Sequence, residues 1–244
     1  TPIELDGNST LNVYDGDNSR TLTINGTLSN GNGTGGNGAL VLNQTSTVIL
    51  AGLANDYGNT TIGSAATLRV GDGGANGSLG SGIVTNNGLL IFNRGSGSSY
   101  TQDKTINGTG TFRVQSGTVV GSGAAAFGAN GAKVEVLSGG TINLNGVSRG
   151  ANDMTYTIAG TGNGGVGAIT NTGTDIYEQA GILNLTLSGN ASVGGNNGRF
   201  DIGRSGTEYG AINGGGFTLT KIGSNAIVVR TTASNISYVV SGGS

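Results

Sequence analysis

The residues that could do acid–base chemistry in this chain are thirteen Asp and Glu side chains, and they are dispersed along it. Cleavage of a polysaccharide needs carboxylates that act together on one bond. The closest groupings are Asp15 with Asp17 and Asp175 with Glu178, and acids spaced in this way are typical of solvated turns. His and Cys are absent, so the common nucleophile–base triads are excluded. We predict no catalytic residue and no enzyme.

The sequence signals for a metal or cofactor site are equally weak. The segment Asp15-Gly16-Asp17-Asn18 begins like an EF-hand loop, but Arg20 and the lack of the closing glutamate break the pattern. The segment from Gly71 to Gly77 shares only its glycines with the calcium-binding nonapeptide repeats. They are not a phosphate loop either, because no helix or P-loop lysine follows. We predict no metal and no cofactor.

Most of the tyrosines stand outside the main apolar pattern and are expected to be exposed, where they could stack on sugars or contact a partner. These are Tyr14, Tyr57, Tyr100, Tyr177, Tyr209 and Tyr238. Packing at the edges of the fold is the interpretation we favour, so no binding residue is assigned.

The composition limits the class of protein. Gly supplies 51 of 244 residues, hydrophobic residues are 34%, charged residues are 10% and the net charge is −2. Disorder usually combines high charge with few aliphatic residues, which does not describe this chain. A net charge this close to zero gives no sign of the basic surface that nucleic-acid binding requires. The chain opens Thr1-Pro2 with no basic or apolar leader, so a secretory signal has either been removed or was never present, and no run is long enough for a membrane-spanning helix. The lack of Cys suits an oxidising, secreted environment.

The elements that would position these side chains are short strands. Apolar residues alternate with polar ones, which predicts half-buried strands. The alternating sets are Leu11/Val13, Leu22/Ile24, Leu40/Leu42, Val48/Leu50, Leu68/Val70, Phe112/Val114, Val134/Val136, Ile142/Leu144, Tyr156/Ile158, Leu183/Leu185/Leu187, Phe200/Ile202 and Phe217/Leu219. Clusters rich in Gly, Asn and Ser separate them, as turns require. No helix is predicted.

Asn-Gly steps such as Asn25-Gly26, Asn107-Gly108 and Asn145-Gly146 recur between strands. Such a step can be a hairpin turn, which would build an antiparallel sandwich, or a corner of a parallel coil. Small turn residues, strand signals that continue from Leu11 to Val240, and polar residues placed to bond along an axis favour the coil. We predict one β-solenoid domain over residues 1–244, an elongated rod of about ten to thirteen coils with the alternating apolar side chains inside.

Residues 68–94 closely resemble the autotransporter-associated β-strand repeat. Residues 47–62 look like the opening half of that repeat, and residues 217–229 look like its restart; residues 95–216 fit loosely. The resemblance implies a right-handed parallel β-helix displayed outside the bacterial outer membrane, as part of a larger surface protein. The chain lacks the membrane β-barrel that ends a complete autotransporter.

The expected function is that of an extracellular structural and adhesive stalk on the bacterial cell surface or secreted from it. The terminal strands around Leu5 and Ile236–Val240 carry no visible cap, which leaves two interpretations open: head-to-tail self-association through strand addition, or coils that continue into flanking repeats of a larger protein. Host or matrix glycans or proteins are the other expected partners. Two alternatives stay open: a polysaccharide-active β-helix enzyme, and a specific glycan-binding adhesin.

Overall fold

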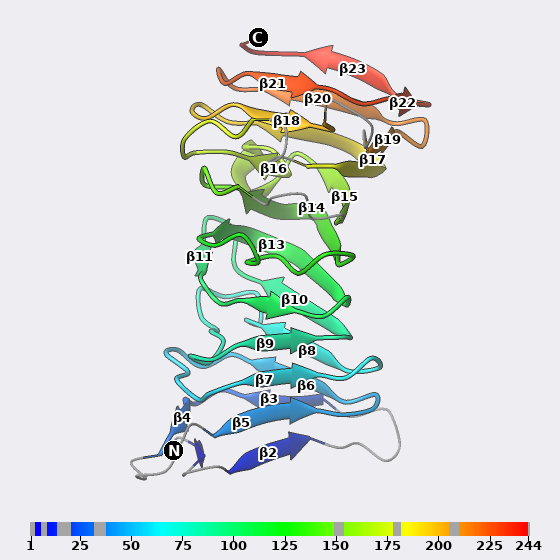
Figure 1. Ribbon diagram of the computed structural model, residues 1–244. Coiled ribbons are helices and arrows are strands. Elements are labelled where there is room, and N and C mark those ends of the chain that lie inside the picture. Colours follow the sequence, from blue (N-terminus) through cyan, green and yellow to red (C-terminus); the bar gives the residue numbers. More distant parts are fainter. Residues whose placement is uncertain are drawn as a thin grey trace.

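The computed structural model describes residues 3–5, 9–13, 21–31, 38–148, 154–177, 182–204 and 210–243. Parallel coils stack along one axis into a β-solenoid of about nine turns (Figure 1). The only helical piece in the described part of the chain is η1 (Asn163–Gly165), a single 3-10 turn. The prediction of an all-β solenoid is confirmed, and the described residues contain no helix apart from η1.

Each coil runs over a first, a second and a third face in that order, and equivalent strands of successive coils pair with one another. The first face holds β2 (Thr10–Val13), β5 (Ala39–Leu42), β7 (Thr60–Ile62), β9 (Val84–Asn86) and β12 (Ile106–Asn107), and nearer the C-terminus β18 (Phe200–Ile202) and β21 (Ile227–Val229). The second face holds β3 (Thr21–Ile24), β6 (Thr47–Leu50), β8 (Thr67–Val70), β10 (Leu89–Asn93), β15 (Thr155–Gly160), β19 (Ala211–Asn213) and β22 (Ala233–Ser234).

The third face holds β1 (Ile3–Leu5), β4 (Leu28–Asn30), β11 (Ser99–Gln102), β16 (Ile169–Thr170), β20 (Thr218–Ile222) and β23 (Ser237–Val240). Long strands bend from the second face into the third and join the two faces. They are β13 (Thr111–Gly121), β14 (Lys133–Asn143) and β17 (Asn184–Gly194). Between Val114 and Ser116 the register of β13 on β14 shifts, as expected where a strand bends.

The Asn-Gly steps are corners, because the strands they join belong to different faces and every strand pair in the described residues is parallel. Asn107-Gly108 links β12 to β13, and Gly108 has φ 89°, a value that favours glycine. At this corner a side chain would also meet the carbonyl oxygen of Asn86 in the coil beneath. Hairpin turns are therefore excluded at these corners.

The central coils repeat with a constant length that the sequence analysis missed. Thr67 pairs with Leu89 and Leu89 with Thr111, so each coil advances by 22 residues; Arg113 and Glu135, also 22 apart, form a cross-strand ion pair. Later coils are longer, because Thr155 pairs with Asn184, 29 residues on. The predicted ten to thirteen coils were too many for this reason.

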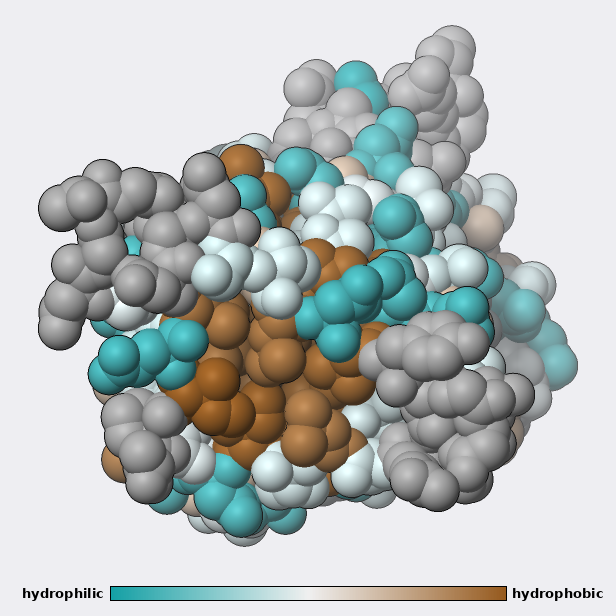
Figure 2. All heavy atoms as spheres, turned by 90° about the horizontal axis from the view of Figure 1, so that it is seen from below, coloured by the Kyte–Doolittle hydropathy of each residue, from teal (hydrophilic) through white to brown (hydrophobic). Residues whose placement is uncertain are grey.

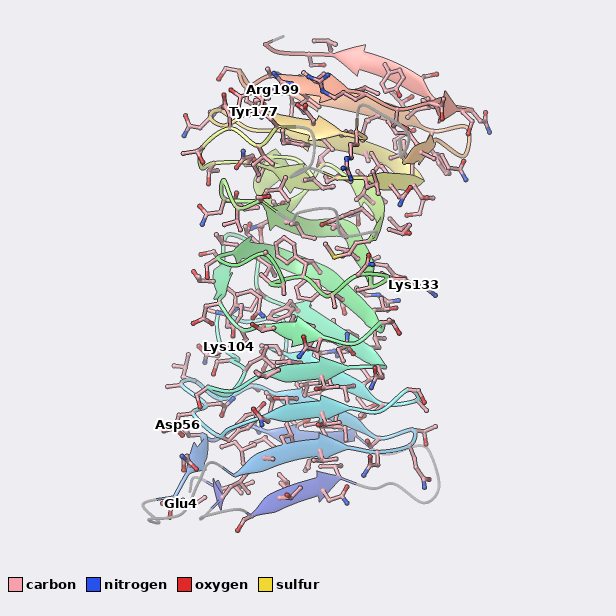
Figure 3. The ribbon with its side chains drawn as sticks, in the orientation of Figure 1. Glu4, Asp56, Lys104, Lys133, Tyr177 and Arg199 are labelled. Atoms are coloured by element: carbon pink, nitrogen blue, oxygen red, sulfur yellow. The ribbon has the colours of Figure 1, made fainter. Side chains whose placement is uncertain are left out.

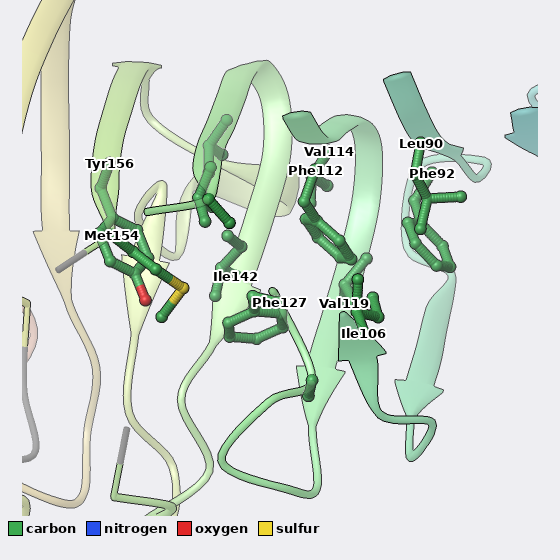
Figure 4. Close-up of a cluster of buried hydrophobic side chains, with 14 of the residues drawn as sticks. Leu90, Phe92, Ile106, Phe112, Val114, Val119, Phe127, Ile142, Met154 and Tyr156 are labelled. Carbon is green, nitrogen blue, oxygen red and sulfur yellow. The ribbon is translucent and has the colours of Figure 1, made fainter. Parts of the chain in front are cut away.

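The core is one continuous column of buried aliphatic and aromatic side chains. Phe92, Phe112 and Phe127 follow one another in this column (Figure 4), with ring centroids 5.1 Å apart for Phe92 and Phe112 and 5.4 Å apart for Phe112 and Phe127. The Tyr100 ring lies 5.0 Å from that of Phe92. Most of the alternating residues predicted to point inward are buried, which confirms their orientation. Leu11, Val13, Leu183 and Phe217 are half-buried. Leu22 is 40% exposed, because no described coil lies beneath it at the N-terminal end.

Polar side chains also connect successive coils along the third face. The Asn55 Oδ1 accepts from the backbone N–H of Leu28 at 2.7 Å, and its Nδ2 donates to the carbonyl of Ser78 at 2.8 Å. Asn163 lies outside the ladder and still spans several coils, since its side chain contacts Gly97 N and Thr118 Oγ1. These contacts confirm that stacked polar side chains bond along the axis.

Candidate functional site: an ionic clasp and two open ends

Several acids singled out in the sequence lie outside the described residues, namely Asp15, Asp17 and Glu178. Asp72 is exposed and accepts a 3.1 Å hydrogen bond from the backbone N–H of Gly74, as in a solvated turn. Within the described ranges, no group of three or more potential metal ligands comes together.

Asp175 belongs to a side-chain cluster on the first face that sequence reasoning missed. Near the C-terminal end, Asp201 accepts hydrogen bonds from Arg199 Nε at 2.7 Å and Nη2 at 2.8 Å, and from Arg230 Nε at 2.7 Å. Its side chain is fully buried beneath them. We call Asp201, Arg199 and Arg230 the arginine clasp. The isolated bridge of Ile176 with Phe200 brings Asp175 and Tyr177 beside it.

Tyr177 and Arg199 lie beside each other on the outside of the stack (Figure 3), with the Arg199 guanidinium 4.7 Å from the ring centroid. Tyr177 Oη donates to Asp175 at 2.8 Å, and Arg199 N donates to the same carboxylate at 2.8 Å. These bonds lower the pKa of Asp175. A glycosidase acid needs the opposite, a raised pKa. The hydrogen bonds found here favour the ionised form of Asp175.

The tyrosines divide into buried and exposed sets. The interpretation of Tyr57 as an exposed aromatic was wrong, because its side chain is fully buried. Its hydroxyl shares a 3.1 Å hydrogen bond with Thr60 Oγ1. The ring lies against Gly80, where any larger side chain would collide with it. Tyr100 packs against the core. Tyr177 and Tyr238 are exposed. Tyr14 and Tyr209 lie outside the described residues.

The N-terminal end of the stack is open and apolar. The strands β1, β2 and β3 form its lower edge, and among the described residues each pairs on one side only. Apolar side chains gather at the centre of this end (Figure 2). Ile3 and Leu22 are 40% exposed there, while Leu11 and Val13 pack against the core from the edge. This end therefore presents core side chains and backbone edges that no described coil covers.

The C-terminal end is open in the same way. Its upper edge is made by β21, β22 and β23, and a cavity of about 200 Å³ opens there between Val193, Ile202, Leu219, Tyr238 and Val240. Val240 is 67% exposed and Tyr238 is 49% exposed. In the register of β20 and β23, Tyr238 follows Leu219 in the inward column and Val240 follows Lys221.

Lys221 is a cation in an apolar column, since its neighbours in register are Val193 and Val240. Its Nζ donates to the carbonyls of Gly223 at 2.7 Å and Gly242 at 2.6 Å. Burial lowers its pKa. Lys221 thereby ties the segment after β23 to the coil beneath.

These features define the class: a β-solenoid repeat protein. Among the described residues, no helix is long and apolar enough to cross a membrane. No family model, curated protein or solved structure matches the chain. The predicted autotransporter membership therefore has no support from these comparisons.

Proposed function

We propose that this chain is an extracellular structural and adhesive stalk of a bacterial surface or secreted protein, stiffened by its continuous ladder and able to stack end to end. The observation that carries the proposal is the unbroken core from the lower to the upper edge. In a solenoid each coil contacts only its neighbours, so a rod is the natural product of this architecture.

The surface location rests on the sequence. Residues 68–94 resemble the autotransporter-associated repeat, and that resemblance also implies right-handed coiling. The lack of Cys suits export through an oxidising compartment. Labelling of intact cells of the source bacterium with an antibody raised against this chain tests the location. Labelling that needs permeabilised cells would contradict it.

End-to-end stacking is supported by the match between the two ends. Both expose apolar core residues, Leu22 below and Val240 above, and both carry strands with one free edge among the described residues. When one surface of a chain binds a different surface of the next copy, every added copy leaves a free surface for another. Unless the rotation between copies closes a ring, the product is a filament.

Two substitutions on β23 test the stacking. Val240→Lys places a charge in the inward column, where the next copy would cover it, so we expect assembly to be lost. Ser237→Lys is the matched control, since Ser237 is exposed on the same strand and does not line the cavity at this end, so assembly should be unchanged. Sedimentation velocity over a range of concentrations, with electron microscopy, measures both. A monomeric parent chain at high concentration would contradict stacking.

Adhesion through glycans is a second candidate, favoured by the exposed Tyr177 ring between Asp175 and Arg199. Aromatic rings flanked by polar groups suit sugar binding. A glycan array with the parent chain and Tyr177→Ala tests it, with Asp72→Ala as the control. The same spots with the same intensity for Tyr177→Ala would remove this residue from any binding role.

A further inference from the structure

The outer side of the second face is regular over the central coils. From β8 through β10, β13 and β14 to β15, the first four residues of each strand stay in register without a shift. Equivalent side chains of successive coils therefore recur about every 4.8 Å along the axis, and outward residues two apart on one strand are about 6.7 Å apart. This sheet face is a grid on which side chains stand at fixed distances.

One pair of side chains occurs twice on this grid. Thr67 and Arg69 point outward from β8, and Thr111 and Arg113 point outward from β13, because the residue between them is buried in each strand. We call each pair a Thr-Arg unit. Only β10 lies between the two strands, so the units are two coils apart, about 9.6 Å along the axis.

The strand between the units holds the two arginines in place. Ile91 of β10 lies between Arg69 and Arg113 in register and is only 4% exposed, although it is on the outer side of the sheet. Neighbouring side chains must lie over it, and arginine stems cover apolar surface in this way while the guanidinium stays in water. An arginine with a packed stem loses little conformational freedom when it binds a ligand.

The charge on this face is only partly neutralised. Arg69 has no ion pair or hydrogen-bonded side-chain partner in the described part of the chain, and of its guanidinium nitrogens only Nε is enclosed. Arg113 pairs with Glu135, whose Oε2 lies 2.7 Å from both Nε and Nη2. Lys133 is exposed at the start of the next strand. The face therefore carries three cations and one carboxylate.

The other bases of residues 38–148 are already used within the fold. Arg94 is buried and donates to a backbone carbonyl, and Lys104 pairs with Asp103 at 2.8 Å. In Figure 3, Lys133 lies on one side of the stack, and Lys104 and Asp56 lie toward the other. Open positive charge is thus concentrated on the second face, although the net charge of the whole chain is −2.

We propose that the second face binds a linear polysaccharide with a carboxylate or sulfate on every second sugar, laid along the solenoid axis. The guanidinium and hydroxyl groups of each Thr-Arg unit bind one anionic sugar. Leu89, which is partly exposed between the units, contacts the sugar between them. A sugar unit is about as long as the spacing between coils, so anions on alternate sugars meet both units.

Binding at this face rests on the adhesive part of the proposed function and gives it a partner class. A nucleic acid is the competing polyanion. Single strands bind by stacking their bases on aromatic side chains, and no outward residue of β8, β10, β13, β14 or β15 is aromatic. Three cations are also few beside the roughly 6–10 phosphate contacts of a typical DNA-binding protein. The threonine hydroxyls suit a ligand rich in hydroxyl groups.

Surface plasmon resonance with immobilised polysaccharides tests the proposal. The probes are hyaluronate, with a carboxylate on every second sugar, chondroitin sulfate, which adds sulfates, and neutral dextran. We expect the chain to bind at least one anionic probe, more weakly as salt rises, and to ignore dextran. Which anionic probe binds separates carboxylate from sulfate recognition.

Two variants that each remove one positive charge locate the site. Arg69→Gln removes the unpaired guanidinium, so we expect about tenfold weaker binding. Lys104→Gln is the matched control, since its charge is already paired with Asp103, and its affinity should equal that of the parent chain. Thr155→Glu serves if Arg69→Gln does not fold: Thr155 is exposed and follows Lys133 in register, so the new carboxylate offsets that cation, with about threefold weaker binding.

Three results would overturn the proposal. The first is no binding of the parent chain to either anionic probe at low salt. The second is equal affinity of the parent chain and Arg69→Gln, or an equal loss in Lys104→Gln, which would assign binding to overall charge. The third is single-stranded DNA bound as tightly as the polysaccharides. Each leaves the stalk and its surface location standing, because sedimentation and cell labelling measure those separately.

Discussion

At the scale of single residues, the structure uses its few charges and hydroxyls to hold coils together. The arginine clasp neutralises the buried Asp201 with cations from its own strand and from a position 29 residues on. A buried carboxylate without such partners would be strongly destabilising. Near the upper end, the ammonium group of Lys221 is stabilised in the same way, because it donates hydrogen bonds to the backbone carbonyls of Gly223 and Gly242.

The buried Tyr57 makes a prediction about pH. Burial raises its pKa to about 12, against an ordinary value of 10.0. Since the folded pKa is the higher one, the stabilisation is complete below pH 10 and is lost as the pH rises toward 12. Over that interval we expect a loss of up to about 2 kcal/mol near Tyr57. Hydrogen exchange or chemical denaturation across this range measures it.

Tyr57→Phe is the control, because it keeps the ring and removes the ionisable hydroxyl. It should cost about 1 kcal/mol at neutral pH through the lost bond to Thr60, and it should flatten the loss of stability above pH 10. An equal loss in both proteins would assign the effect to other tyrosines.

At the scale of elements, inward positions of the central strands decide local stability. Val134 on β14 is fully buried and pairs with Phe112 below and Tyr156 above. Val134→Asp buries an unpaired carboxylate, so we expect a loss of several kcal/mol and reduced amide protection in β13, β14 and β15.

Lys133→Ala, one residue earlier on the exposed side of the same strand, should change stability by less than about 0.5 kcal/mol. Hydrogen exchange resolves the effect coil by coil, which suits a fold whose units interact only with their neighbours. Loss of protection spread evenly over the whole rod would argue against this local view.

At the scale of the whole molecule, shape follows from the number of turns. About nine turns with a rise of about 4.8 Å each give a stack roughly 40–45 Å tall. We expect small-angle scattering at low concentration to report an elongated particle of this length. Growth along one axis with concentration is the expected sign of end-to-end stacking, and a globular profile would contradict the rod.

The sequence by itself determined the strands and their inward sides, because period-two alternation is a local property that each strand carries. The 22-residue repeat is also present in the sequence, although Leu90/Phe92 did not enter our alternating sets. The pairs that carry it are Leu68/Val70, Leu90/Phe92, Phe112/Val114, Val134/Val136 and Tyr156/Ile158. With that pair included, the five pairs follow one another at a constant spacing, so the period is visible in the sequence alone.

Only the tertiary structure decided which residues from different coils meet. Arg230 reaches Asp201 across 29 residues, and Tyr57 is buried because its coil turns it toward Gly80; neither contact has a local signature. Coil lengths vary at the corners, so the distance along the chain between stacked residues cannot be read from a single strand.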